Sequence, residues 1–284
     1  MKEVGSLTGI FRYPVKSMLG ENLDSSRLEL DGIPGDRCWG VRDEARGDFF
    51  VGKRSAALMG CSAWYPDGAD TTGLEAVPRI RVPDGQTFSA DSNSAARLLS
   101  QVVERDVTIW PVVPEARQAT PKDDVNLMDE MQEMMARTGD EPIPDFSDPA
   151  PELLEVYARG GPFFDAFPLL LMSQRSIDSL AEAAPESAMD VRRFRPNLLV
   201  ETDEPGPFPE RDWIGKRLRI GQTVLSIHSE CIRCVMTTHG FADLPKDPRV
   251  MRTLVRKAGG NLGVYALVEE FGEIRRDDSV TLLD

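Results

Sequence analysis

The chain alternates short apolar runs with turns rich in glycine and proline, a pattern typical of β-strands joined by tight loops. In the first third, strands are predicted over residues 6–12, 23–30, 38–41 and 49–51, and a helical apolar stripe covers residues 94–104. This part is therefore predicted to be a β-rich unit with one helix.

The same pattern returns in the last part of the chain. Residues 167–172 form a continuous apolar run typical of a buried strand, and we expect a helix capped by Ser173 or Ser176 to follow it. Another helix is expected over residues 247–257. Further strands are predicted over residues 198–200, 218–220, 224–228, 262–269 and 279–282. The expected fold class is mainly β with helices (α+β), built from barrel or sandwich units.

Between these parts the composition of the sequence changes. Prolines and acids become frequent and apolar anchors few, which favours a long irregular connection or lid. Packing against a neighbour explains the helically spaced methionines in this region better than a metal site does; they are Met128, Met131, Met134 and Met135. We therefore divide the chain into an N-terminal β unit at 1–112, an acidic, proline-rich connection at 113–162 and a second β unit at 163–284.

Composition narrows the class of protein. A chain of 284 residues is long enough for two packed units without disulfides, and four cysteines with no signal peptide at the start indicate reduced thiols in the cytoplasm. No apolar run reaches the roughly 18 residues of a membrane-spanning helix. The net charge of −14 argues against a nucleic-acid partner. It leaves open a local anion site, because the placement of Lys and Arg decides that more than the total charge.

Several polar residues lie where the chain presents donors to an anion. Lys16 and Ser17 follow a predicted strand, and glycines beside Arg37 and Arg54 allow close backbone approach. A Ser-capped helix start presents free N–H groups, and arginine offers bidentate donors to phosphate or carboxylate. Each residue taken singly is more typical of a solvated side chain or a salt bridge. The donors marked in this way are Lys16, Ser17, Arg37, Arg54, Ser173, Arg195 and Asn197.

Two of the four cysteines, Cys231 and Cys234, form a Cys-x-x-Cys pair directly after a predicted strand. A zinc site needs more ligands than this segment supplies, and a thioredoxin-like pair belongs at a helix start, whereas residues 235–238 are β-branched and strand-prone. A cysteine protease would need His228 or His239 as its base, and no signature supports that pairing. A further reading is one thiolate on a soft metal whose remaining ligands come from a cofactor.

Four motifs in order resemble those of a known family. They are Tyr13-Pro14-Val15-Lys16-Ser17, Gly35-Asp36-Arg37, Phe194-Arg195-Pro196-Asn197 and the run from Arg233 to Thr238. The chain resembles MOSC-domain proteins over nearly its whole length. It is similar to the class with an N-terminal MOSC β-barrel domain, which includes the mitochondrial amidoxime-reducing component and its bacterial relatives.

The resemblance implies two β-barrel-like domains, with the MOSC N-terminal β-barrel at 1–112 and the MOSC domain at 163–284. It implies a molybdenum cofactor (Mo-molybdopterin) between them, with Cys234 as the metal thiolate and catalytic residue. Cys231 does not match the ligand position. The family also carries an association with pyridoxal phosphate binding. By similarity, the pterin and its phosphate would be held by Lys16, Ser17, Arg37, Arg54, Ser173, Arg195 and Asn197.

The implied reaction is the reduction by Mo(IV) of the N–O bond in N-hydroxylated or N-oxide compounds. The clustered cysteines of a [2Fe–2S] domain are lacking, so an external reductase or ferredoxin-type donor is expected, and no membrane anchor is expected. The loop at 239–245 and the acidic stretch at 122–165 depart from the family and bear on the substrate. The alternative is a non-catalytic carrier of the cofactor or of sulfur; a descendant without the cofactor is a third reading.

Overall fold

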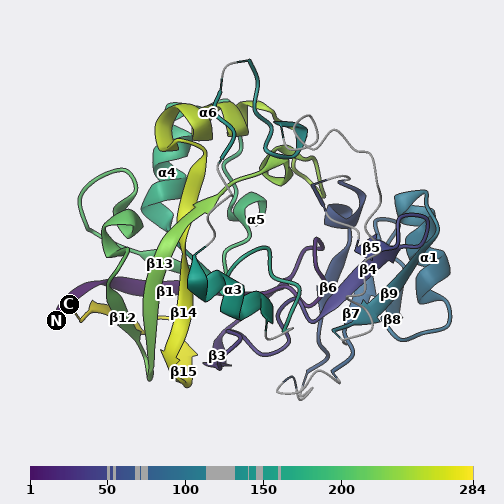
Figure 1. The fold of residues 1–284 in the computed structure, drawn as a ribbon, viewed down its shortest axis with the longest axis horizontal. Coiled ribbons are helices and arrows are strands. Elements are labelled where there is room, and N and C mark those ends of the chain that lie inside the picture. The colour runs from purple at the N-terminus through teal and green to yellow at the C-terminus, as the bar shows by residue number, and fades with distance from the viewer. Residues whose placement is uncertain are drawn as a thin grey trace.

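Two β-rich units lie side by side along the long axis of the molecule (Figure 1). This computed structural model describes residues 1–49, 52–53, 56–67, 71, 76–112, 132–139, 141–144, 150–158 and 161–283. The barrel that carries both chain termini lies at the left of the view, and the N-terminal unit lies at the right. The predicted class, mainly strands with a few helices, is confirmed.

The larger unit is a closed barrel of seven strands. Its sheet runs in the order β11-β10-β14-β13-β12-β16-β1, and pairing of β1 with β11 closes it, while β2 extends the edge of β1. The bounds are β1 (Lys2–Arg12), β2 (Glu21–Leu23), β10 (Leu169–Ser173), β11 (Leu198–Glu201), β12 (Arg217–Ile220), β13 (Thr223–Ile232), β14 (Asn261–Glu270) and β16 (Ser279–Leu282). Barrel closure removes the exposed strand edges that favour aggregation.

The first strand crosses the predicted domain division. β1 pairs antiparallel with both β11 and β16, so its residues complete the barrel of the C-terminal part. The division at 112 and 163 stays a prediction about the sequence. In space, the chain begins in the second unit and then enters the first.

Apolar side chains from alternate strand positions fill the barrel, together with Trp213 at the end of η3 (Pro209–Trp213). Three helices, α4 (Gln174–Ala183), α5 (Val191–Phe194) and α6 (Arg249–Ala258), pack on one side through a second apolar cluster. That cluster includes Leu180, Phe194, Leu254 and Cys231. One face of β13 therefore meets this helical layer.

The N-terminal unit contains two small sheets and one helix around their own core. The sheets are β5-β4-β9 and β6-β7-β8. Their bounds are β4 (Trp39–Asp43), β5 (Asp48–Phe49), β6 (Ser62–Trp64), β7 (Arg79–Arg81), β8 (Thr87–Ser89) and β9 (Val107–Pro111), with η1 (Ala57–Gly60) and α1 (Ala95–Val103) beside them. The predicted helix at 94–104 is confirmed by α1, whose buried stripe includes Leu98 and Leu99.

A separate ladder joins β3 (Ser25–Leu28) to β15 (Gly272–Arg275), a short strand that the apolar pattern did not indicate. Glu273 and Arg275 point to solvent on this strand, which leaves too little apolar signal to predict it. The predicted strand at 23–30 is thereby divided between β2 and β3.

The segment after Cys234 is not a strand, although its β-branched residues predicted one. Residues Val235–Thr238 form a 3-10 turn, η4. The hydroxyl of Thr237 donates to the Cys234 carbonyl at 3.1 Å, and that of Thr238 donates to the Val235 carbonyl at 2.7 Å. These local bonds favour a turn over a ladder for residues that otherwise prefer strands.

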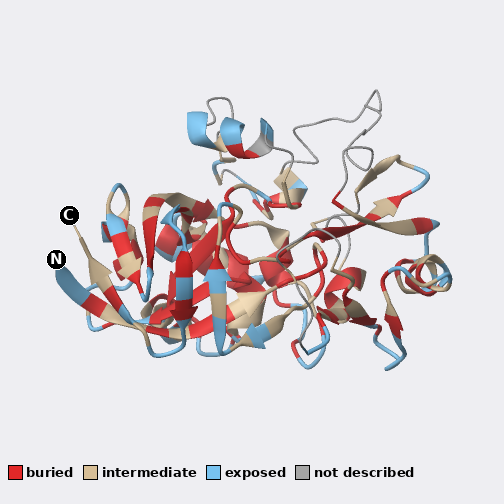
Figure 2. Ribbon diagram, turned by 90° about the horizontal axis from the view of Figure 1, so that it is seen from below, coloured by how far each residue is buried: buried red, intermediate tan, exposed pale blue. Residues whose placement is uncertain are grey.

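Parts of the acidic connection pack against the barrel side. Residues 132–139 and 141–144 contact α6, where Arg252 pairs with Glu141 and buried Arg137 donates to Met251 Sδ at 3.2 Å. The helix α3 (Pro151–Ala158) projects from the outer surface with an exposed face (Figure 2). Met128 and Met131 lie outside the described residues.

No helix in the described part of the chain has both the length and the apolar character to cross a membrane.

Gly263 on β14 offers a test of how tightly the barrel is packed. Its φ is +74°, and an added Cβ would lie 2.5 Å from Met172 Cγ, whereas Gly259 has a φ of +65° with open space around it. We expect Gly259→Ala to lower the free energy of unfolding by about 1 kcal/mol through backbone strain alone. Gly263→Ala should cost about 3 kcal/mol, because a steric clash adds to the strain. Urea unfolding measures both, and equal losses would contradict the packing.

Candidate functional site

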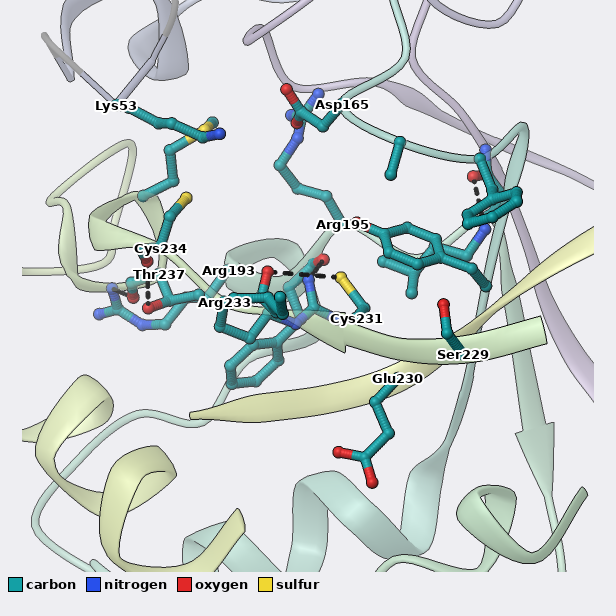
Figure 3. A pocket seen from close by; sticks show the side chains of 18 of the residues that line it. Lys53, Asp165, Arg193, Arg195, Ser229, Glu230, Cys231, Arg233, Cys234 and Thr237 are labelled. Atoms are coloured by element: carbon teal, nitrogen blue, oxygen red, sulfur yellow. Dashed lines mark hydrogen bonds between the residues drawn. The ribbon is translucent and has the colours of Figure 1, made fainter. Parts of the chain in front are cut away.

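A cavity of about 260 Å³ lies where the end of β13, the turn η4 and the N-terminal unit meet. Its walls combine cations, two acids and two cysteines with apolar side chains (Figure 3). The polar lining includes Arg37, Lys53, Asp165, Arg193, Arg195, Asn197, Cys231, Arg233 and Cys234. The apolar lining includes Met135, Leu153, Phe167, Leu170, Met236 and Tyr265.

Cys234 directly precedes η4 and is partly exposed, whereas the other three cysteines are buried. Burial raises the pKa of its thiol, the Lys53 ammonium opposes that shift, and Asp165 adds to it. Figure 3 shows the Cys234 sulfur on the same side of the cavity as Lys53, apart from the sulfur of Cys231. Cys234 is therefore an accessible thiol whose ionisation responds to neighbouring charge.

Cys231 has a different environment on β13. Its side chain is buried in the apolar cluster between barrel and helices, and its thiol lies 3.7 Å from the Ile232 carbonyl. Tyr265 hydrogen-bonds to it, and burial together with Cys231 raises the pKa of Tyr265. The two cysteines are thus not equivalent partners of one site.

Within the described ranges of the chain, no partners support the zinc and cysteine-protease interpretations of the pair. Among the described residues no three His, Cys, Asp or Glu side chains are grouped to hold a metal ion. His239 Nε2 bonds to the Gly52 carbonyl at 3.0 Å, and His228 Nε2 lies 3.3 Å from Glu152. Both histidines are therefore engaged away from the thiols.

Arg195 and Arg37 flank the ring of Tyr13. The Arg195 guanidinium lies 4.2 Å from the ring centroid, donates to the Met18 carbonyl, and has its pKa lowered by burial to about 10. The Arg37 guanidinium lies 5.0 Å from the same centroid and pairs with Asp36. Both backbones have a positive φ, 53° and 52°, which directs these side chains out of regular elements.

Asn197 connects these groups to the barrel. Its amide Nδ2 donates to Asp36 at 3.1 Å and to the Phe11 carbonyl at 3.2 Å. Its Oδ1 accepts from the Leu170 N–H at 3.2 Å and from Arg37 at 3.3 Å. Every polar atom of the side chain has a protein partner, so Asn197 mainly orients Arg37.

Lys16 and Ser17 lie just behind the cavity wall. Lys16 Nζ donates to the Phe163 carbonyl at 2.8 Å and to Asp165 Oδ1 at 2.9 Å. Burial lowers the pKa of Lys16, and Asp165 opposes that shift. The Ser17 hydroxyl accepts from the Gly52 N–H at 2.9 Å. Asp165 thus lies between Lys16 and the space of the cavity.

The structure does not bring Ser173 to this group. It is fully buried at the start of α4, where its hydroxyl caps the Ser176 N–H at 3.1 Å and donates to Glu210 at 2.7 Å. The predicted cap is confirmed, but its hydroxyl does not line the cavity. Arg54 lies outside the described residues.

Two arginines that shape the cysteine loop were not predicted from the sequence. Arg193 donates to the carbonyls of Thr237, His239 and Pro245, and Arg233 donates to those of Leu262 and Phe194. Both are buried among backbone acceptors, so they hold the loop in shape. Their signal was present, since one lies in the arginine run and the other between the cysteines.

Lys53 and Asp165 were missed for another reason. Lys53 neighbours Arg54, the residue of that segment predicted as a donor, and Asp165 ends the acidic stretch at 122–165. Nothing local to either residue indicates that both line the cavity with Cys234.

Comparison with known proteins agrees with the two-unit architecture. Residues 4–126 match the model of the MOSC N-terminal beta barrel domain, and residues 159–281 match that of the MOSC domain. The chain is 22% identical over 308 residues to mitochondrial amidoxime reducing component 2 of Bos taurus, covering 99% of this chain and 84% of that protein.

Solved structures are similar to the chain at lower sequence identity. The YUAD protein from Bacillus subtilis is 12% identical with a TM-score of 0.44, over 99% of this chain and 96% of that one. YiiM from Escherichia coli is 14% identical with a TM-score of 0.32, over 41% of this chain and 54% of that one.

The exposure of the cysteines predicts selective labelling in the native chain without added ligands. Iodoacetamide should modify Cys234 before the three buried cysteines, slowly near pH 7 and faster as the pH rises, because burial raises its pKa. Lys53→Met should slow labelling at a given pH, because Lys53 lowers that pKa, whereas Lys257→Met on exposed α6 should not. Peptide mass spectrometry follows each site, and equal labelling of Cys231 would contradict the assignment.

Proposed function

Because the chain belongs to the MOSC-domain proteins with an N-terminal MOSC β-barrel domain, we propose that it is a molybdenum-cofactor-dependent oxidoreductase of N-hydroxylated or N-oxide compounds. The observation that carries the proposal is the accessible Cys234 thiol in a cavity whose wall also presents several cations. A soft thiolate suits a high-valent metal, and the cations suit an anionic cofactor.

The donor set fits such a cofactor. Arg37, Arg195 and Lys53 line the cavity, and Lys16 and Ser17 lie directly behind it. These residues would hold the pterin and its phosphate, Cys234 would ligate the metal, and Asn197 would orient Arg37. Ser173 and Glu210 would act at a distance, by fixing the start of α4. Arg54 stays a predicted donor.

When bound, the cofactor supplies two-electron reduction of an N–O bond, which yields an amine and water once two protons are added. The chain contributes the conditions for that chemistry. Lys53 favours the thiolate of Cys234 against the effect of burial, and Arg193 holds the loop that follows it. Arg37 and Arg195 would neutralise anionic groups within a site of restricted water.

The remaining wall is suited to an organic substrate. Leu153, Phe167 and Tyr265 line the cavity with apolar or aromatic surface, which would bind the carbon skeleton of an N-hydroxylated compound. An external reductase or ferredoxin-type protein would supply the electrons, as sequence reasoning predicts. A cytoplasmic location and binding of pyridoxal phosphate stay predictions.

Metal analysis tests the cofactor and its ligand. Chain produced in a host that makes the cofactor should contain about one molybdenum and one pterin per chain. Cys234→Ala should lose most of both, because it removes the thiolate, and Cys231→Ala should keep most of the metal, because that thiol is buried in the apolar cluster. Elemental analysis with pterin fluorescence measures both. Stoichiometric zinc without pterin, or equal losses in the two variants, would contradict the proposal.

Turnover distinguishes a reductase from a carrier. With a dye reductant, the loaded chain should convert an arylamidoxime to the amidine, and Cys234→Ala should lower the rate by at least about a hundredfold, as expected for loss of an essential group. Liquid chromatography quantifies the product. Tight molybdenum binding with no reduction of any N-hydroxylated compound would favour the non-catalytic carrier of the cofactor or of sulfur.

A further inference from the structure

The segment 161–167 bridges the two units beside the cavity. At Phe163 it is bound to the N-terminal unit, where its N–H donates to the Arg37 carbonyl at 2.9 Å and its ring lies 4.3 Å from that of Phe49. At Phe167 it is bound to the barrel, with ring centroids 4.7 Å from His228 and 5.5 Å from Tyr265. The main chain is therefore held on both sides of Asp165.

Asp165 itself lies half-exposed between these two attachments. Its side chain is 51% exposed, compared with 13% for the Lys16 side chain that it pairs with. Figure 3 shows it at the edge of the cavity, across from Lys53. Because half of the side chain is exposed, water can replace part of the ion pairing when the carboxylate turns away.

Three cations, Lys16, Lys53 and Arg37, act on the Asp165 carboxylate. Burial would raise its pKa, but Lys16, Lys53 and Arg37 outweigh that and lower it, so the carboxylate is ionised under ordinary conditions. These three cations are among those that the proposed function assigns to the anionic part of a cofactor. An anion entering this group therefore meets Asp165 already in place.

We propose that the Asp165 carboxylate is an internal stand-in anion, which partly offsets the positive charge of Lys16, Lys53 and Arg37 until a phosphate-class ligand displaces it. The proposal rests on the proposed function only for the identity of that ligand. Lys16 keeps the Phe163 carbonyl when Asp165 leaves, so the segment stays attached while the site opens.

This exchange has two consequences for the chain. Without ligand, the carboxylate reduces the repulsion among these cations. A monovalent anion that enters the site must compete with Asp165, which lowers its affinity. A phosphate competes better, because it carries more charge and more acceptor atoms than one carboxylate. The stand-in therefore favours phosphate-bearing ligands over the small anions of the cell.

The test is titration of the full, cofactor-free chain with inorganic phosphate at constant ionic strength, followed by calorimetry. Asp165→Asn should bind phosphate roughly tenfold more tightly than the wild type, because the competing charge is gone. Adding Lys16→Met to this variant should abolish the gain. Asp165→Ala repeats the comparison with another side chain, and a thermal melt verifies that each variant is folded.

Glu155→Gln on α3 is the matched control, since it removes one exposed acid from the preceding helix. It should bind phosphate as the wild type does. The proposal is overturned if both Asp165 variants bind no more tightly than the wild type, or if Glu155→Gln gains as much, which would indicate a general effect of net charge. The phosphate titration uses neither cofactor nor reductase. Its result can therefore be interpreted even if metal analysis contradicts the proposed function.

Discussion

The buried carboxylate of Asp36 is the interaction on which the arrangement of the site depends. It is fully inaccessible, and it accepts from the Tyr13 N–H at 2.7 Å, from Asn197 at 3.1 Å and from Arg37. A buried charge must be paired, because leaving it uncompensated costs about 3–5 kcal/mol. Tyr13 follows β1 and Asn197 precedes β11, so meeting this demand joins the strands that close the barrel to the N-terminal unit.

The hydrogen-bond network of Asp36 also positions two arginines that line the cavity. Arg37 is fixed by Asp36 and Asn197, and Arg195 stacks on the Tyr13 ring that this network positions. A chain with a net charge of −14 thus presents a local cationic surface beside its accessible thiol. Local placement rather than total charge sets the chemistry of the cavity.

Periodic and capping signals predicted the parts of the fold that local sequence controls. The helix α1, the Ser173 cap of α4 and most barrel strands follow from apolar spacing and turn residues. The pairing of β1 with β11 does not, because its partners lie about 190 positions apart in the chain. The turn η4 was also mispredicted, since threonine hydroxyls satisfied locally outweighed the strand preference of the same residues.

The candidate site shows the same limit. Motif order grouped Lys16, Arg37, Arg195, Asn197 and Cys234, and the structure places them at or directly behind one cavity. It assigns Ser173 to a buried contact with Glu210, a partner that no spacing rule indicates. The proposed role of Asp165 depends on cations that are distant in the sequence and that the fold brings together. No local sequence pattern therefore predicts it.

Anomalous diffraction at the molybdenum edge, from crystals of the full chain made in a cofactor-producing host, tests the role of Cys234 most directly. The expected result is one molybdenum peak bonded to Cys234 Sγ within the cavity between the two units. A molybdenum peak elsewhere, or a cavity that holds no molybdenum while zinc is bound by the chain, would contradict that role.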